Sequence, residues 1–164
     1  MSDAVLIRPI SADEFAPFGD VLSCDGTPSA LINQGNCERY TDLATLDFRD
    51  GTAGISLFDA RPRQLPYCLD MVERHPRGSQ AFIPMTAAPF LAIVAEGADS
   101  EPGRVHAFEV PAGTGINLHR NVWHGVLTPL HPPGLFAVID RIGPGDNLEE
   151  YWFPEAKGRA QLTL

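Results

Sequence analysis

The sequence predicts an all-β domain, built as a sandwich or barrel of short strands. Short apolar runs alternate with turn residues at the spacing typical of such folds. Fifteen glycines and fifteen prolines interrupt a chain of 164 residues too often for a helical bundle. Hydrophobic residues make up 44% of the chain, which is enough for a packed core. A chain of this length fits one domain of ordinary size, so we expect a single domain over residues 1–164.

Each predicted strand is an apolar or alternating run that ends at a proline, a glycine or a short polar turn. The run 90–95 is apolar throughout, which is typical of a strand buried on both faces. The Pro-Ala-Gly and Pro-Pro-Gly turns supply the fixed or positive φ values that reverse the chain. The predicted strands cover residues 20–23, 54–58, 69–75, 79–83, 90–95, 105–110, 115–119, 124–127 and 135–141.

Two short helices complete the predicted domain. Ser11 can cap the first helix, and the acidic residues Asp13 and Glu14 would follow in its first turn, near the positive end of the helix dipole. Phe15 and Phe18 would form its buried side. A second short helix is predicted at residues 148–151.

Charge and cysteine content narrow the classes of partner and the compartment. The net charge is −9 and no block of lysine or arginine occurs, which disfavours nucleic acid and anionic membranes as partners. No apolar run reaches the ~20 residues of a membrane span, and residues 1–10 lack the pattern of a secretion signal. The cysteines, Cys24, Cys37 and Cys68, are odd in number and share no CxxC spacing. We therefore expect reduced thiols and a cytoplasmic protein.

The first concentration of polar residues is a predicted hairpin over residues 73–84. Alternation along a strand directs Glu73 and His75 to one side and Arg74 to the other. A turn at Arg77-Gly78 would return Gln80 opposite them, so that three groups with lone pairs converge. The same spacing also fits a hairpin with a solvated polar face. Arg74 is expected to pair with an acid outside the barrel.

The second concentration lies at residues 115–125. His119 and His124 flank a short turn next to Trp123, and Asn117 shares one strand side with His119. A histidine in such a place is often only a structural residue bonded to the backbone, and that alternative stays open for His119. Trp123 is expected in the core or at a contact between subunits.

These two segments resemble the paired motifs of the cupin superfamily. Glu73-x-His75-x4-Gln80 is similar to the first motif, His-x-His-x4-Glu, and His119-x-Asn121-x2-His124 is similar to the second, Pro-x-Gly-x2-His. The glycine that closes the first motif is Ala87 here, and the asparagine that closes the second is Thr128. The resemblance implies a cupin-type, double-sheet β barrel of the jelly-roll kind, in which both hairpins face one metal ion.

A narrower resemblance covers nearly the whole chain. The strings ERHPRGSQAFIPM (73–85), GINLHRNVWHGVL (115–127) and FAVIDR (136–141), with FGDV (18–21) and ERY (38–40), are similar to the ureidoglycolate lyase family. Membership implies a homodimer that cleaves (S)-ureidoglycolate into glyoxylate and urea in allantoin catabolism. It also implies a divalent metal, nickel by the family's association. The open alternatives are another metal-dependent cupin enzyme acting on a small polar acid, and a non-catalytic small-molecule-binding cupin.

The reaction assigns roles to the residues of both segments, because cleavage of the carbon–nitrogen bond needs a base and an acid. A metal would be held by the imidazole and oxygen donors Glu73, His75, Gln80 and His124, and restoring the motif carboxylate by Gln80→Glu would tighten its binding. His119 is the candidate proton carrier, with His75 as the alternative. The predicted catalytic residues are thus His119, His75 and His124, and the predicted substrate-binding residues are Gln80, Asn117 and Arg141.

Overall fold

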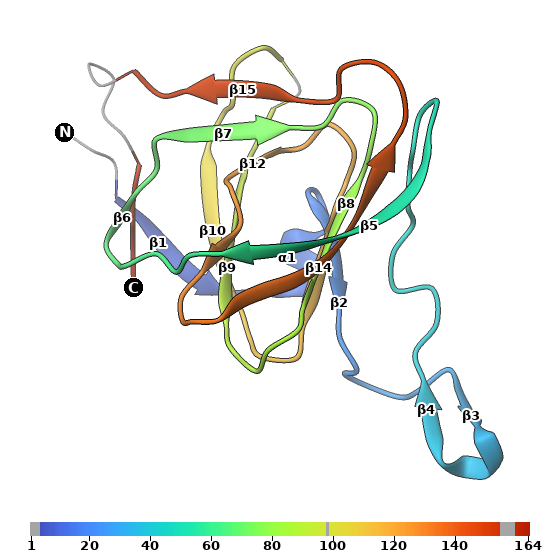
Figure 1. Cartoon of the computed structure of the whole chain (residues 1–164). Coiled ribbons are helices and arrows are strands. Elements are labelled where there is room, and N and C mark those ends of the chain that lie inside the picture. Colours follow the sequence, from blue (N-terminus) through green and yellow to red (C-terminus); the bar gives the residue numbers. More distant parts are fainter. Residues whose placement is uncertain (1–3, 98, 155–159) are drawn as a thin grey trace.

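The computed structural model describes residues 4–97, 99–154 and 160–164, and they form two curled β-sheets with a projecting hairpin. Figure 1 shows the two sheets wrapped around a common interior. The larger sheet has the order β15-β7-β12-β9-β10-β1-β16-β6, with β13 added beside β9. Its strands are β15 (Glu149–Trp152), β7 (Met71–Arg74), β12 (Trp123–His124), β9 (Phe90–Ala95), β10 (Val105–Val110), β1 (Ala4–Pro9), β16 (Gln161–Thr163), β6 (Tyr67–Cys68) and β13 (Thr128–Pro129).

The second sheet has five strands in the order β2-β11-β8-β14-β5. These strands are β2 (Gly19–Leu22), β11 (Gly115–Leu118), β8 (Gln80–Pro84), β14 (Gly134–Ile142) and β5 (Thr52–Ala60). A separate hairpin, β3 (Ala30–Ile32) and β4 (Cys37–Arg39) joined by the 3-10 turn η1 (Asn33–Gly35), projects away from the barrel (Figure 1). The predicted all-β, cupin-like architecture is confirmed.

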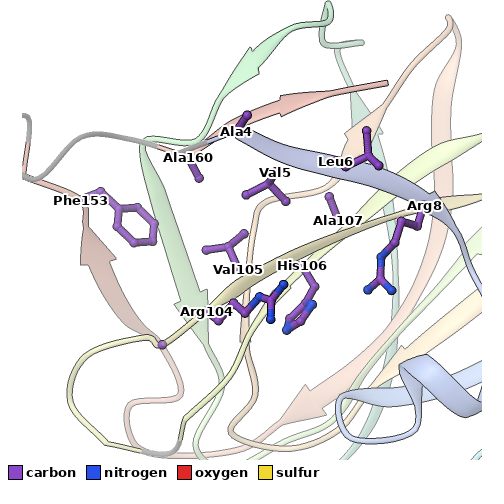
Figure 2. A pocket seen from close by; sticks show the side chains of 11 residues that line it. Ala4, Val5, Leu6, Arg8, Arg104, Val105, His106, Ala107, Phe153 and Ala160 are labelled. Carbon is purple, nitrogen blue, oxygen red and sulfur yellow. The ribbon is translucent and has the colours of Figure 1, made fainter. Parts of the chain in front are cut away.

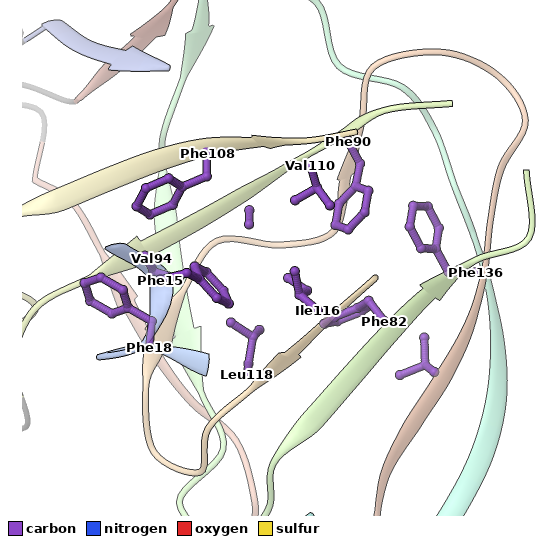
Figure 3. Close-up of a cluster of buried hydrophobic side chains, with 12 residues drawn as sticks. Phe15, Phe18, Phe82, Phe90, Val94, Phe108, Val110, Ile116, Leu118 and Phe136 are labelled. Atoms are coloured by element: carbon purple, nitrogen blue, oxygen red, sulfur yellow. The ribbon is translucent and has the colours of Figure 1, made fainter. Parts of the chain in front are cut away.

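The core between the sheets is aromatic. Figure 3 shows Phe82 and Ile116 of the five-stranded sheet facing Phe90, Val94 and Phe108 of the larger sheet. Phe90 also meets Phe136 edge to face, with ring centroids 5.0 Å apart. Burial of such rings supplies much of the hydrophobic stabilisation of a small barrel. This cluster defines the interior side of both sheets.

The predicted first helix is confirmed as α1 (Ala12–Phe15). The Oγ atom of its N-cap, Ser11, accepts a hydrogen bond from the backbone N–H of Glu14 at 3.3 Å. Phe15 and Phe18 are both buried, and Phe15 packs edge to face on Phe108. The helix therefore closes one end of the core. No helix in the described part of the chain has the length and apolar character needed to cross a membrane.

The strand predictions are accurate where the apolar run is continuous. β9 and β10 occupy the predicted residues 90–95 and 105–110. The predicted strand 69–75 begins only at Met71, because the backbone N–H of Leu69 donates a hydrogen bond to the carbonyl of Ala160 instead. The predicted strand 124–127 is shortened to Trp123–His124. The sequence did not predict the six strands β1, β3, β4, β6, β13 and β16.

The second predicted helix, at residues 148–151, is wrong. Residues Glu149–Trp152 form β15, which pairs antiparallel with β7 at the sheet edge. Tyrosine and tryptophan favour strands. An ion pair between Glu149 and Arg74, at 2.5 Å, joins the first residue of β15 to its partner strand. Pairing with β7 outweighs any local helical tendency of so short a segment.

Candidate metal and active site

The structure brings Glu73, His75 and His124 together. One ligand atom of each lies within 4.8 Å of the others, so the three could hold one metal ion. The two imidazole centroids are 5.2 Å apart, and His75 Nε2 lies 3.9 Å from Glu73 Oε1. The sequence-predicted convergence of the two hairpins is therefore present for these three residues.

Strand pairing positions the cluster. His124 on β12 lies directly opposite Glu73 on β7 and, on its other side, opposite Val94 on β9. Val94 belongs to the aromatic core, so His124 and Glu73 lie on the interior side of the larger sheet. His75 follows β7 directly, and its carbonyl accepts from the backbone N–H of Asn121 at 2.9 Å. That bond ties the first motif hairpin to the turn of the second.

Each clustered imidazole has its Nδ1 atom next to a backbone carbonyl. His75 Nδ1 lies 2.8 Å from the oxygen of Asn147, and His124 Nδ1 lies 3.0 Å from that of Gly125. A carbonyl can only accept, so Nδ1 carries the proton in both rings and Nε2 keeps its lone pair. Both Nε2 atoms are buried and have no hydrogen-bond partner in the described part of the chain. This arrangement is typical of histidine ligands of metals.

Burial sets the charge state of the cluster. The pKa of His124 falls to about 3, chiefly because burial penalises the imidazolium and also because His75 lies close by. The pKa of the Glu73 carboxyl is raised, mainly by burial, and His75 acts against that rise. A neutral His124 offers its Nε2 lone pair throughout the neutral pH range. The cluster is therefore ready to receive a cation.

Gln80 lies on the interior side of the opposite sheet. It pairs in register with Leu118, a member of the aromatic core, and is itself buried. Its amide nitrogen Nε2 donates to Asp140 Oδ2 at 3.3 Å, and Oε1 is buried with no partner among the described residues. Unpaired buried acceptors on Gln80, His75 and His124 fit a bound divalent cation, because a cation would compensate the cost of their burial.

In the turn of the second motif, Asn121 occupies the position of the usual glycine, and the backbone there has the conformation that a glycine would adopt. Asn121 has a φ of 67°, the left-handed conformation that glycine adopts most readily. Asparagine tolerates this conformation better than most other residues. Asn121 therefore replaces the motif glycine and keeps the tight turn between His119 and His124.

His119 and Asn117 are not joined to the cluster by any hydrogen bond or ring contact in the described residues. Asn117 alternates along β11 with Ile116 and Leu118, which face the core, so it lies on the opposite side of the strand. Its Nδ2 donates to Asp20 Oδ2 at 3.0 Å. The other Asp20 oxygen lies 3.2 Å from His119 Nε2. Asp20 thus bridges these two predicted site residues.

Arg141 is used as a structural tie. Its Nε donates to the carbonyl of Arg49 at 2.5 Å, and Nη2 donates to those of Asp50 and Pro144 at 2.9 and 2.7 Å. The side chain is buried and fastens two loops beside the first motif hairpin. A Cβ atom on Gly78, in the turn of that hairpin, would lie 2.7 Å from Arg141 Cβ.

Arg74 and Trp123 are placed as the sequence predicts. The Arg74 guanidinium pairs with Glu149 and lies 4.3 Å from the centroid of the Trp123 ring. Trp123 is 2% exposed and belongs to a second core cluster on the outer side of the larger sheet. Both side chains therefore support the strands that carry Glu73 and His124 without entering the candidate site.

Residues 45–49 join the two motif hairpins, which the sequence did not reveal. Asp47 N donates to Ser79 Oγ at 3.0 Å, and Ser79 N donates to the Asp47 carbonyl at 2.9 Å. The Asp47 carboxylate accepts from Arg120 Nε at 2.9 Å, which lowers the pKa of that carboxyl. Asp20, Asp47 and Asp140 all act through contacts distant in sequence, so no local spacing could have identified them.

Two cavities lie beside β7 and β1. One of about 300 Å³ reaches Glu73 and is also lined by Arg63, Tyr67, Glu150 and Trp152. Figure 2 shows the other, of about 670 Å³, between β1 and β10, with Val5, Arg104 and His106 on its walls. The cavity of Figure 2 contains none of the predicted site residues. Of these two cavities, only the smaller one reaches a residue of the cluster, and a further cavity of about 760 Å³ is lined in part by residues 120–122 of the second motif turn.

Comparison with known proteins places this geometry in a family. The sequence profile of the family described as ureidoglycolate lyase matches residues 2–159. The chain is 56% identical over 153 residues to a ureidoglycolate lyase of Rhodobacter capsulatus, covering 93% of this chain and 95% of that protein. It is 52% identical to "Ureidoglycolate lyase 2" of Rhizobium meliloti, with 90% and 91% covered, and 48% identical to the Mesorhizobium japonicum enzyme, with 93% and 94% covered. The chain belongs to the ureidoglycolate lyase family.

Proposed function

We propose that the protein is a ureidoglycolate lyase, which cleaves (S)-ureidoglycolate into glyoxylate and urea. The observation that carries the proposal is the cluster of Glu73, His75 and the buried His124 in a chain that belongs to this family. The relatives named as ureidoglycolate lyases are 40–56% identical over most of the chain. The small cavity that reaches Glu73 suits a substrate of a few atoms.

The reaction requires two proton movements at one carbon. That carbon of ureidoglycolate bears a hydroxyl, a ureido nitrogen and a carboxylate. Removal of the hydroxyl proton lets the oxygen form the aldehyde of glyoxylate as the carbon–nitrogen bond breaks. The electron pair of that bond stays with the nitrogen, which takes up a proton and leaves as urea. A group that titrates near neutrality, such as histidine, can serve both movements.

We propose that a divalent metal, nickel by family resemblance, is held by Glu73, His75, Gln80 and His124. Support comes from the buried, unpartnered Nε2 atoms of both histidines and Oε1 of Gln80. When bound, the metal would act as a Lewis acid that lowers the pKa of the substrate hydroxyl. The protein supplies fixed tautomers, because both Nδ1 protons are directed to backbone carbonyls.

We propose His119 as the proton carrier, supported by Asp20. Its side chain is 41% exposed, and a carboxylate oxygen 3.2 Å from Nε2 can orient the ring. His75 is the alternative carrier if no metal occupies the cluster. Asn117 and Arg141 stay proposed substrate-binding residues, although the guanidinium hydrogen bonds in the described structure run to backbone carbonyls.

Glyoxylate release tests the proposed function directly. Purified protein, stripped of metal and then reloaded with Ni²⁺ or Mn²⁺, is incubated with (S)-ureidoglycolate, and glyoxylate is followed against the uncatalysed reaction. We expect release far above the background rate with at least one ion. Release at the background rate under every condition would refute the proposal.

We also propose a homodimer, formed through the outer face of the five-stranded sheet. Ile55 and Leu57 on β5 are 77% and 63% exposed, and Ile83 on β8 is 40% exposed. Leu57, Ala137 and Ile83 form one row across three strands, so the apolar surface is continuous. Continuous exposed apolar surfaces mark sites of association.

In the proposed dimer, the projecting β3–β4 hairpin of one copy packs on this apolar face of the other copy. A two-stranded hairpin alone is marginally stable in water, and one side of it carries Ile32 and Arg39. On β5, Asp59 lies on the same side as Leu57. Within the described residues neither Arg39 nor Asp59 has an ion-pair partner. In a two-fold symmetric dimer, the apolar contact and the Arg39–Asp59 ion pair would each occur twice.

A cytoplasmic location is proposed with the enzyme. The three cysteines are free thiols, and Cys24 and Cys68 are exposed. Exposed reduced thiols are typical of proteins kept in a reducing compartment.

A further inference from the structure

Asp140 lies across the strand pair from Gln80, on the interior side of the five-stranded sheet. Strands β14 and β8 pair Ile139 with Ala81, and the next position of the antiparallel ladder sets Asp140 against Gln80. The Gln80 Nε2–H donates to Asp140 Oδ2 at 3.3 Å. The other end of the amide, Oε1, is buried with no partner in the described chain.

We infer that Asp140 is a positioning residue, which orients the Gln80 amide so that its oxygen is presented to the metal cluster. This inference rests on the proposed metal site. A carboxylate only accepts hydrogen bonds, so it favours the amide orientation that directs the NH₂ group toward it. The reversed amide would set its oxygen against the Asp140 oxygens. It would also turn two N–H groups toward the region where a cation needs lone pairs.

The same contact explains why glutamine replaces the glutamate of the first cupin motif. A glutamate at position 80 would bring a second carboxylate against Asp140, and like charges at that distance disfavour the ionised pair. We therefore expect Gln80→Glu alone to weaken metal binding, in contrast to the expectation from the motif. Gln80→Glu combined with Asp140→Asn removes the repulsion, because the new amide can donate to the new carboxylate.

A double-mutant cycle in metal affinity tests the role of Asp140. Wild type, Asp140→Asn, Gln80→Glu and the double variant are stripped of metal and titrated with Ni²⁺ by calorimetry. We expect Asp140→Asn to weaken Ni²⁺ binding by about 10-fold in the wild-type background, the usual scale for a residue that orients a ligand. In the Gln80→Glu background the same change should strengthen binding by a similar factor. Asp25→Asn, at an exposed aspartate outside both sheets, is the matched control and should leave the Ni²⁺ affinity unchanged.

The effect of Asp140→Asn on Ni²⁺ affinity should have opposite signs in the two backgrounds, and general structural damage would lower the affinity in both. Equal affinities of wild type and Asp140→Asn would overturn the inference, and so would a loss of affinity in both backgrounds. Thermal melts of the stripped proteins check folding, and Asp140→Ser replaces Asp140→Asn in the cycle if the asparagine variant does not fold. A wild-type protein that binds no Ni²⁺ would overturn the inference together with the metal site. Glyoxylate release is measured on the same preparations, so failure of the proposed lyase activity is seen separately.

Discussion

The Nδ1 atom of His75 lies 2.8 Å from the carbonyl oxygen of Asn147, a residue 72 positions later in the chain. The side chain of Asn147 also accepts a hydrogen bond from the backbone N–H of Arg77 at 2.7 Å. The loop between β14 and β15 therefore holds the hairpin that presents His75 at two points. Because the first of these bonds fixes the tautomer, it prepares Nε2 for a ligand.

Asn147→Ala should weaken Ni²⁺ binding by about 10-fold, since the loop loses one of its two attachments and the ring is held less firmly. Loss of the amide bond to Arg77 should cost about 1 kcal/mol of unfolding free energy. Calorimetric titration and denaturant unfolding measure the two effects. Asp146→Ala, at the exposed neighbouring position, is the control. An unchanged affinity in Asn147→Ala would show that the backbone carbonyl alone suffices.

His75→Ala and His119→Asn should separate metal binding from proton transfer. The first should lose bound Ni²⁺ and at least ~100-fold in kcat, while its barrel stays folded. The second should lose ~100-fold in kcat and keep its metal, because His119 contacts Asp20 rather than the cluster. Elemental analysis and initial rates measure both quantities. Full activity in His119→Asn would assign the proton carrier elsewhere, with His75 as the next candidate.

Arg141→Lys should reduce the free energy of unfolding by roughly 2–3 kcal/mol, because a lysine cannot reach all three carbonyl acceptors at once. Arg61→Lys, on an exposed position, should have little effect. Urea unfolding and the KM for ureidoglycolate are measured on both variants. A large rise in KM at unchanged stability would instead show that this guanidinium binds the substrate carboxylate.

The contact between Asp47 and Arg120 should make the stability of the protein depend on pH in the acid range. The hydrogen bond from Arg120 lowers the pKa of the Asp47 carboxyl below its ordinary value of 3.8, which is the value expected in the unfolded chain. Its stabilising contribution is therefore complete above that value and is lost as the pH falls further. Asp47→Asn should be less stable than wild type near neutrality, and the difference should shrink below about pH 4. Asp42→Asn, at an exposed position of the same segment, is the matched control.

Charge reversal should test the proposed dimer. Wild type is expected to sediment as a dimer, and Arg39→Asp or Asp59→Arg should shift it toward monomer by placing like charges together. The chain that carries both substitutions should recover the dimer, because each copy then restores the opposite pair. A monomeric wild type would contradict the proposal. Three dimeric variants of unchanged stability would place the interface on another surface.

The fold class and the ligand cluster could be predicted from the sequence because their signals lie within short stretches of the chain. Continuous apolar runs such as Phe90–Ala95 and closely spaced polar residues such as Glu73 and His75 carry their signal locally. The β15 strand was missed because its pairing with β7 depends on a partner far away in the chain. The roles of Asp47 and Asp140 depend on contacts 73 and 60 residues apart, which no spacing rule encodes.

Backbone carbonyls, rather than the metal, hold both imidazoles of the cluster in their ligand-ready tautomers. A small zinc finger needs its ion in order to fold, but these two contacts and the apolar core predict that this barrel folds before any ion binds. Chelators should therefore yield a stable empty barrel that accepts a different ion afterwards. Which ion the proposed metal site holds would then be decided by supply as well as by affinity.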